Sequence, residues 1–243
     1  MRVAENSNRR LLLLSNSRDE SGRFLQHTGS DVSAHFAGVR KVTFVPFAAV
    51  TVGWDAYTQH VREAMGAFGV EVESVHEVRD ARHAIEHAEA IAVGGGNTFH
   101  LLAQLQRAGL LSFMRARAMS GVPYLGWSAG SVIASPTMQT TNDMPITQPE
   151  SFASLGLIGF QINAHFTDTH PAGFQGETRR QRLAEYVAAN PTSSVVGLPE
   201  GTWLRVDGSS VVLRGLHDAP LFRFGAADGV LARNIEIGEQ LET

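Results

Sequence analysis

The chain has 243 residues, 43% hydrophobic and 18% charged, which is long enough for one substantial core and hardly for two. Its 20 basic and 24 acidic residues give a net charge of −4. This charge argues against duplex nucleic acid or an anionic membrane as a partner, because either requires a cationic surface. The absence of cysteine excludes disulfides, thiolate metal sites and cysteine nucleophiles. We therefore expect one domain over residues 1–243 in a reducing compartment, the cytoplasm.

The first ten residues, MRVAENSNRR, are polar, and we expect residues 1–10 to form a flexible tail. The apolar run that follows, Leu11–Leu14, is too short for the core of a signal peptide or for a membrane span. It is the first of several short apolar runs that end in turn residues.

These runs alternate with longer amphipathic stretches, a pattern typical of βαβ units around a parallel sheet. Strands are predicted at residues 11–14, 42–45, 70–75, 90–93, 124–126 and 195–198. Helices are predicted at residues 54–68, 99–107 and 110–119, where apolar side chains recur every three or four residues. The expected fold class is α/β with a mostly parallel sheet, and ligands are expected beyond the carboxyl ends of its strands.

The segment from Met138 to Phe174 has no helical periodicity and is rich in Thr, Asn, Asp, Pro and Gly. This composition predicts long loops of the kind that often carry function. A helix is predicted at about residues 178–189. Short strands near residues 202–206, 210–214 and 221–224 then predict an antiparallel edge.

The sharpest local signal is Gly126-Trp127-Ser128-Ala129-Gly130, a G-x-S-x-G pattern between an apolar run and a predicted helix start. Strand, tight turn and helix form the context of a nucleophile elbow. Glycines two residues to either side leave room for the turn that projects the serine hydroxyl. The helix N-terminus then directs partial positive charge at any oxyanion formed beside it. An ordinary turn rich in Gly and Ser is the alternative.

A second glycine cluster, Gly94-Gly95-Gly96-Asn97-Thr98, follows the predicted strand at 90–93. It matches neither a dinucleotide-binding fingerprint nor a phosphate-binding loop. Its expected use is to donate an N–H, from Gly95 or Gly96, to an oxyanion hole in which Ala129 donates the other. One such donor is worth about 2.7–4 kcal/mol in the transition state. A glycine-rich turn without a ligand is the alternative.

A serine nucleophile needs a base, and of the ten histidines His165 has the most favourable context, because it follows the apolar stretch Phe160–Ile162. The carboxylate that orients this base stays open among Asp143, Asp168 and Glu200. Glu200 follows a predicted strand at its carboxyl end, and Asp143 lies in the loop after the elbow. Asp168 fits a turn or helix cap better.

A competing pattern is His83-Ala84-Ile85-Glu86-His87, which matches the H-x-x-E-H motif of some zinc peptidases. The surrounding stretch is rich in ionisable residues, which is typical of a solvated helix face. No third metal ligand is evident downstream. We therefore expect no metal and no cofactor.

As a whole the chain resembles the peptidase E family of α-aspartyl dipeptidases. The resemblance rests on matches in one order, namely Leu12–Ser17, Pro46–Ala48, Val93–Phe99, Gly126–Gly130, Thr141–Pro145, His165-Phe166, Gly176–Arg179 and Gly197–Gly201. It implies a flavodoxin-like or class I glutamine amidotransferase-like three-layer fold and hydrolysis of dipeptides with an amino-terminal aspartate. Two positions depart from the family pattern: Ala164, where proline often precedes the histidine, and Ser131-Val132, where asparagine-like residues often follow the elbow.

The resemblance also implies residue roles, with Ser128 as nucleophile and His165 as base. It favours Glu200 as the orienting carboxylate and leaves Asp143 a supporting or amine-binding role. Arg179 is the implied cation for the substrate's aspartate, since a guanidinium pairs with a carboxylate through two hydrogen bonds. Asn97 and Thr98 complete the expected substrate-binding residues.

Three rival functions remain open at this point. A cyanophycinase-like peptidase or a serine esterase would share the fold and the elbow, and a non-catalytic binder of small ligands would share the fold alone. The expected partner is a small peptide substrate. Composition does not determine the oligomeric state, so a homodimer stays open.

Overall fold

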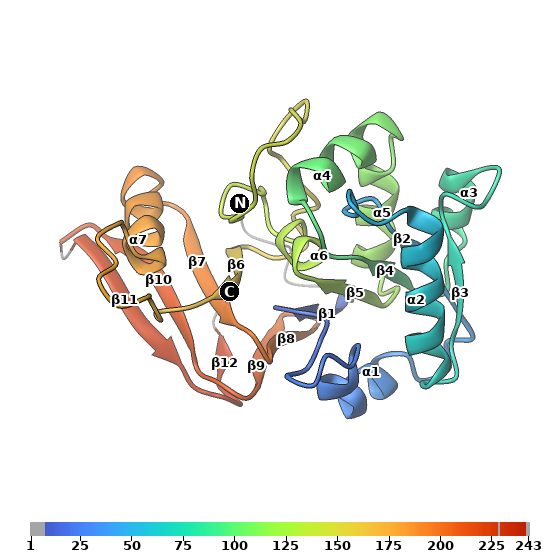
Figure 1. The fold of residues 1–243 in the computed structure, drawn as a ribbon, viewed down its shortest axis with the longest axis horizontal. Helices are drawn as coiled ribbons and strands as arrows, with labels where there is room; N and C mark the ends of the chain where they lie inside the picture. Colours follow the sequence, from blue (N-terminus) through green and yellow to red (C-terminus); the bar gives the residue numbers. More distant parts are fainter. Residues whose placement is uncertain (1–7, 228, 242–243) are drawn as a thin grey trace.

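The computed structural model describes residues 8–227 and 229–241, which form two β-sheets with helices packed around them (Figure 1). The larger sheet has eight strands in the order β12-β9-β8-β1-β5-β4-β2-β3. Its strands are β1 (Arg10–Leu14), β2 (Lys41–Val45), β3 (Glu71–Ser74), β4 (Ile91–Val93), β5 (Tyr124–Trp127), β8 (Thr202–Asp207), β9 (Ser210–Gly215) and β12 (Gln240–Leu241). The pairs among β1, β5, β4, β2 and β3 are parallel, whereas β8, β9 and β12 add an antiparallel edge beside β1. The predicted α/β class is confirmed.

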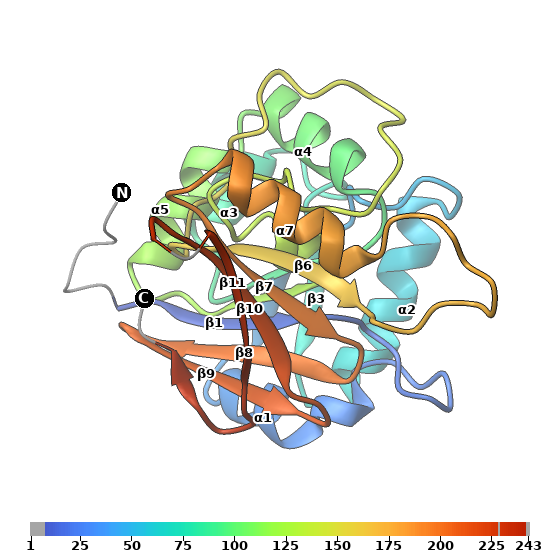
Figure 2. The ribbon, with the colours of Figure 1, turned by 90° about the vertical axis from the view of Figure 1, so that its left-hand side faces the viewer.

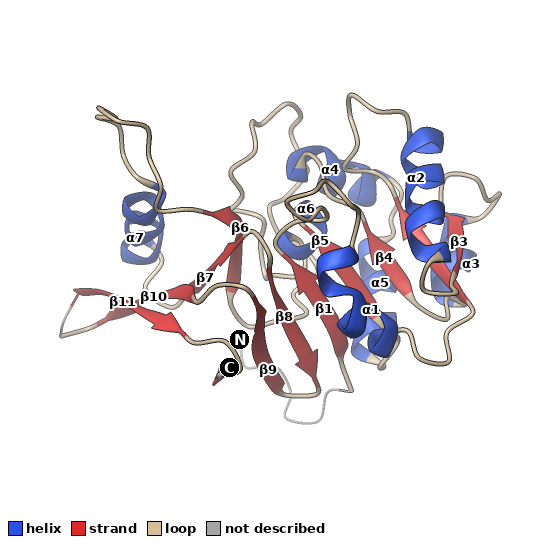
Figure 3. Cartoon of the chain, turned by 60° about the horizontal axis from the view of Figure 1, so that its bottom comes forward, coloured by secondary structure: helices blue, strands red, loops and turns tan. Residues whose placement is uncertain are grey.

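Helices cover both faces of this sheet, because successive side chains of a buried strand point to opposite sides. Leu11 and Leu13 of β1 pack with helices α3 (Ala81–Glu86), α4 (Thr98–Arg107) and α5 (Leu111–Met119). Leu12 and Leu14 pack on the other side with α1 (Gly29–His35) and α2 (Trp54–Gly66). A short 3-10 helix, η1 (Gln26–Thr28), precedes α1, and α6 (Ala129–Val132) follows β5. The result is a three-layer arrangement (Figure 3).

A second sheet has four strands in the order β11-β10-β7-β6. They are β6 (Gln161–Phe166), β7 (Ser194–Pro199), β10 (Ala219–Gly225) and β11 (Gly229–Ile235). Strands β6 and β7 are parallel, and β10 is antiparallel to both β7 and β11. Helix α7 (Arg179–Ala189) lies across this sheet (Figure 2), where Leu183 and Val187 are buried against Phe222.

The structure corrects four expectations. The strand predicted at 195–198 forms, but it lies in the second sheet, and so does the strand predicted at 221–224. Strand β6 occupies part of the segment predicted as loops. Of the expected tail, residues 1–7 lie outside the described residues. Arg9, by contrast, is buried and donates to Gly208 O at 2.9 Å, and Arg10 begins β1. None of the helices in the described ranges has the length and apolar composition that crossing a membrane requires.

Candidate active site

Ser128 lies in a sharp turn between β5 and α6. Its backbone angles are φ 51° and ψ −116°, a conformation that is strained for any residue with a side chain. A Cβ on Gly126 would lie 2.5 Å from Gly130 O, and a Cβ on Gly130 would lie 2.2 Å from Val93 O. Both distances are shorter than real Cβ contacts, so the two glycines are required by the close approach of backbone. The G-x-S-x-G sequence therefore forms the strand-turn-helix geometry that was predicted.

The elbow is fixed to the neighbouring strand by hydrogen bonds. The Ser128 N–H donates to Leu14 O at 3.0 Å. The Ser131 hydroxyl reaches Leu14 O at 2.7 Å and Gly126 O at 2.9 Å. Ser131, one of the departures from the family pattern, thus ties the elbow to β1.

Ser128, His165 and Glu200 form one chain of hydrogen bonds. His165 Nε2 lies 2.9 Å from Ser128 Oγ, and His165 Nδ1 lies 2.7 Å from Glu200 Oε1. The serine comes from the larger sheet, whereas the histidine lies on β6 and the glutamate directly follows β7. The arrangement is that of a nucleophile, a base and an orienting carboxylate.

A distortion of β6 directs His165 toward the serine. The register of β6 against β7 shifts between Ala164 and Phe166, and His165 has φ 55°. Such a bulge re-aims the side chain that it carries. The bulge is fixed by Ser15, because the His165 N–H donates to Ser15 Oγ at 2.9 Å and Ser15 Oγ donates to Leu198 O at 2.8 Å.

The positioning roles of Ser15 and of its neighbour Asn16 were not predicted from the sequence. Asn16 Oδ1 accepts the N–H of Gly201 at 2.8 Å and so fixes the turn that carries Glu200. The signal was present in the family match over Leu12–Ser17, but nothing in that match indicated which contacts these side chains make.

Asp143 makes no hydrogen bond with His165 and instead anchors the N-terminus of α4. Its Oδ2 accepts the Thr98 N–H at 2.7 Å, the Thr98 hydroxyl at 2.5 Å and the Thr141 hydroxyl at 3.0 Å. Asn97 Oδ1 accepts the His100 N–H at 3.0 Å as the N-cap of the same helix, and its amide donates to Met144 O at 2.8 Å. Thr98 is buried, so its hydroxyl is engaged within the protein.

Arg179 lies behind the backbone of His165. Its guanidinium donates to His165 O at 2.8 Å. Burial, and then the nearby charge of Arg182, lowers the pKa of Arg179 below its ordinary value. Arg179 lines a cavity of about 890 Å³ together with Asp143 and Asn163. The remaining carboxylate candidate, Asp168, pairs with Arg180 through two hydrogen bonds of 3.2 and 2.5 Å.

A cleft of about 1040 Å³ opens above Ser128, His165 and Glu200. Residues 16–19 and 48–52 form part of its walls, and Gly95, Gly96 and Asn97 line it together with the serine. A Cβ on Gly95 would lie 2.9 Å from Ser128 Cβ. Within the described residues, the N–H groups of Gly95 and Gly96 donate to no protein acceptor.

The H-x-x-E-H segment does not gather its side chains around one point. The rings of His83 and His87 stack with their centroids 4.1 Å apart, and Glu86 pairs with Arg82. These contacts are those of an exposed helix face.

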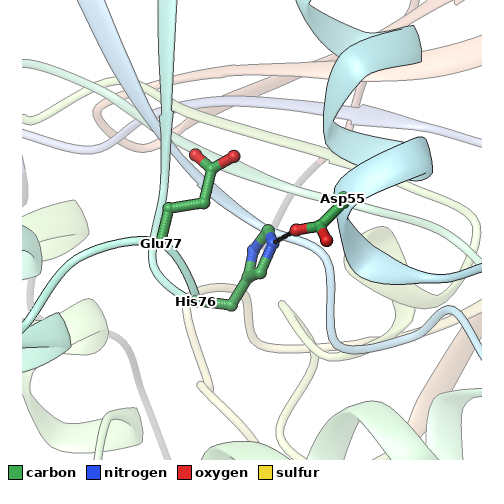
Figure 4. Close-up of side chains that lie close together, drawn as sticks. All are labelled: Asp55, His76 and Glu77. Atoms are coloured by element: carbon green, nitrogen blue, oxygen red, sulfur yellow. Dashed lines mark hydrogen bonds and ion pairs between the residues drawn. The ribbon is translucent and has the colours of Figure 1, made fainter.

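Among the residues that the structure describes, one group of three side chains has metal-ligand chemistry, namely Asp55, His76 and Glu77, with ligand atoms within 4.8 Å of one another (Figure 4). Both His76 nitrogens already have protein partners, Ser74 Oγ at 2.6 Å and Asp55 Oδ1 at 2.8 Å. Glu77 is ion-paired with Arg62. The group therefore has the contacts of a polar cluster that joins β3 to α2.

Comparison with known proteins places the chain in a family. The family model of peptidase family S51 matches residues 11–214. Peptidase E of Nostoc sp. is 45% identical over 219 residues, which cover 89% of this chain and 90% of that protein. Peptidase E of Salmonella typhimurium is 46% identical over 215 residues, which cover 88% and 94% of the two chains.

The crystal structure of a peptidase from an acI-B1 Actinobacterium has a TM-score of 0.71 at 15% sequence identity and covers 98% of each chain, which shows a shared fold. The resemblance drawn from the ordered motifs is thus confirmed by whole-chain similarity. The chain is a peptidase and belongs to peptidase family S51.

Proposed function

We propose that this S51 peptidase is a serine dipeptidase that hydrolyses dipeptides with an amino-terminal aspartate through an acyl-enzyme on Ser128. The continuous hydrogen-bonded chain from Glu200 through His165 to Ser128 carries the proposal. The curated relatives, each named peptidase E, favour this function over an esterase, a cyanophycinase-like peptidase or a non-catalytic binder.

We infer the proton transfers from these hydrogen bonds. With His165 Nδ1–H donating to Glu200, Nε2 is left to accept the proton of the Ser128 hydroxyl. Ser128 Oγ bonds to the carbonyl carbon of the substrate's aspartate, the peptide C–N bond breaks, and His165 returns the proton to the departing amine. Water then attacks the ester while His165 takes a proton from it, the bond between Ser128 Oγ and the acyl carbon breaks, His165 returns the proton to Ser128 Oγ, and free aspartate leaves. This sequence of steps needs no cofactor.

The negative oxygen of the tetrahedral intermediate needs donors that are in place beforehand. The N–H groups of Gly95, Gly96 and Ala129 are proposed for this oxyanion hole, because the glycine loop adjoins Ser128 and Ala129 opens α6. One such donor contributes about 2.7–4 kcal/mol of transition-state stabilisation.

Arg179 and Asp143 are proposed to recognise the amino-terminal aspartate. A half-buried guanidinium binds a carboxylate well because less water competes for it. Asp143 uses Oδ2 in the contacts described above, and its Oδ1 is proposed to accept from the substrate's ammonium. Asn97 and Thr98 support the site by fixing the loop that carries Asp143 to α4.

Purified protein and Ser128→Ala, assayed with Asp-Leu, test the proposal. Wild-type protein should cleave Asp-Leu, and Ser128→Ala should fold normally and lose nearly all turnover. Substantial turnover by the variant would refute the serine mechanism. β-Linked aspartyl-arginine and short acyl esters, run in parallel, test the rival substrates.

Selectivity tests the role of Arg179. Arg179→Ala should lose Asp-Leu cleavage far more than Ala-Leu cleavage, and equal losses would contradict the assignment.

We also propose that the enzyme is cytoplasmic, in keeping with the absence of cysteine. Light scattering of the purified protein would measure whether it forms a homodimer.

A further inference from the structure

The peptide that joins Gly95 to Gly96 lies against the nucleophile and is held by a tyrosine of α2. Gly95 is in direct contact with the elbow, since a Cβ there would lie 2.9 Å from Ser128 Cβ. The Tyr57 hydroxyl donates to Gly95 O at 3.1 Å and accepts from Trp127 Nε1–H at 2.9 Å. A chain of hydrogen bonds therefore runs from the elbow tryptophan through Tyr57 to the glycine loop.

The backbone on either side of this peptide is fixed by other bonds. Gly94 N–H donates to Val45 O at 3.1 Å, and Asn97 N–H donates to Ala48 O at 2.8 Å. Neither bond involves the Gly95–Gly96 peptide itself. Because glycine imposes little steric preference on φ and ψ, hydrogen bonding matters for the orientation of this peptide, and among the described residues the bond from Tyr57 to Gly95 O is the one that it makes.

A trans peptide is planar, and its C=O and N–H point in opposite directions. With Gly95 C=O directed at Tyr57, Gly96 N–H is directed away from it, and Gly96 and Ser128 line the same cleft. A hydrogen bond accepted by the C=O also polarises the peptide and strengthens its N–H as a donor. We propose that Tyr57 is a positioning residue that holds the Gly95–Gly96 peptide so that Gly96 N–H stabilises the oxyanion. This inference rests on the proposed function.

The surroundings of Tyr57 suit this role. Burial raises the pKa of Tyr57 to about 12, so its hydroxyl stays a hydrogen-bond donor throughout the neutral range. Its ring packs edge-on against Phe44 with the centroids 5.4 Å apart. The ring is thus held by packing, and Tyr57→Phe removes both hydrogen bonds of the hydroxyl while preserving the ring.

Kinetics of Tyr57→Phe test the inference, with kcat and KM measured on Asp-Leu and active sites counted with a serine-directed organophosphate. We expect kcat per active site to fall about 10- to 100-fold, somewhat less than full loss of an oxyanion donor. KM should stay within about twofold of the wild-type value, because the oxyanion exists only after attack.

Ser74→Ala is the matched control. The Ser74 hydroxyl is fully buried outside the elbow and is bonded to a backbone carbonyl, Phe44 O, at 3.3 Å and to His76 Nδ1 at 2.6 Å. Its loss should lower Tm and leave kcat per active site within about twofold of wild type, because removing a buried hydrogen bond costs stability.

The outcomes separate the inference from the proposed function. A wild-type value of kcat per active site in Tyr57→Phe would overturn the inference. An equal fall of kcat in Ser74→Ala would also overturn it, since that would identify a general effect of a lost buried hydrogen bond. Wild-type protein that cleaves no aspartyl dipeptide would contradict the proposed function and this inference together.

Discussion

At the scale of single residues, the site combines a strained serine with a histidine on a bulge. Ser128 and His165 both have positive φ, which costs of order 1–3 kcal/mol each where the residue is not glycine. The surrounding contacts offset this cost, since Ser128 is fixed to Leu14 and His165 to Ser15. The pair is therefore in place before substrate binds.

Removing the negative charge of Glu200 or of Asp143 should distinguish the roles of these two carboxylates. Glu200→Gln should lower kcat about 10²- to 10⁴-fold, because the amide no longer stabilises the imidazolium and admits the wrong tautomer of His165. Asp143→Asn should mainly raise KM, since Asp143 is proposed to bind substrate and makes no hydrogen bond with His165. Steady-state kinetics on Asp-Leu measures both variants. A larger loss of kcat in Asp143→Asn than in Glu200→Gln would contradict the assignment of the orienting carboxylate.

At the scale of elements, the elbow depends on the close approach of α6 to β4. Gly130→Ala places a methyl group 2.2 Å from Val93 O, and we expect a loss of at least about 2 kcal/mol in unfolding free energy from this overpacking. Urea denaturation measures the loss.

Gly66→Ala is the control for this element. It lies in α2 with open space at its Cβ position, so it should change stability little or raise it by up to about 1 kcal/mol. Equal unfolding free energies for Gly130→Ala and Gly66→Ala would show that the elbow tolerates a side chain at Gly130.

The contact of α1 with β5 makes stability depend on pH. Burial lowers the pKa of His35 from its ordinary value of 6.5 to about 4, and its Nε2 lies 3.1 Å from Tyr124 O. The imidazole of His35 therefore binds a proton more tightly in the unfolded chain than in the folded one. The stability that neutral His35 contributes is complete above about pH 6.5 and is lost as the pH falls toward 4. The loss is about 3 kcal/mol.

His35→Gln should flatten that acid limb, because the amide keeps a donor for Tyr124 O without titrating. Urea midpoints between pH 4 and 7 measure the effect, with the exposed His217→Gln as the control. An unchanged slope in His35→Gln would show that other groups carry the pH dependence.

The sequence predicts some elements better than others, for physical reasons. Strands β1, β2, β4 and β5 are largely apolar because both faces of a parallel sheet are covered. Strand β6 was missed because polar residues such as Asn163 and His165 interrupt its pattern, and β11 because most of its residues are exposed. The run Val195–Leu198 predicted a strand, but local sequence does not specify which sheet a strand joins.

At the scale of the whole molecule, the site forms where the two sheets meet. The larger sheet contributes Ser128, and the second sheet contributes His165 and Glu200. Local patterns in the sequence pointed to Ser128 and His165, whereas Glu200 was favoured over the other carboxylates only by the family resemblance. The contacts that bring them together depend on the docking of distant strands, which no local pattern reveals.

Ser15 should couple the docking of the sheets to activity. Ser15→Ala leaves His165 N–H without its partner and removes the hydrogen bond to Leu198 O. We therefore expect a loss of about 1–3 kcal/mol in stability together with a fall in kcat of at least about tenfold as His165 shifts. Ser74→Ala, also fully buried but bonded to Phe44 O and His76, should lose comparable stability with unchanged kcat. Equal kcat in the two variants would contradict this coupling.

The central claim is that His165 and Glu200 activate Ser128 as the nucleophile. Mass spectrometry of the protein treated with a fluorophosphonate tests it most directly. The predicted result is one adduct, on the peptide that contains Ser128, which forms at least about tenfold more slowly in His165→Ala because the base is lost. Asp-Leu turnover that continues after full labelling of Ser128, or an adduct confined to another serine, would contradict the claim.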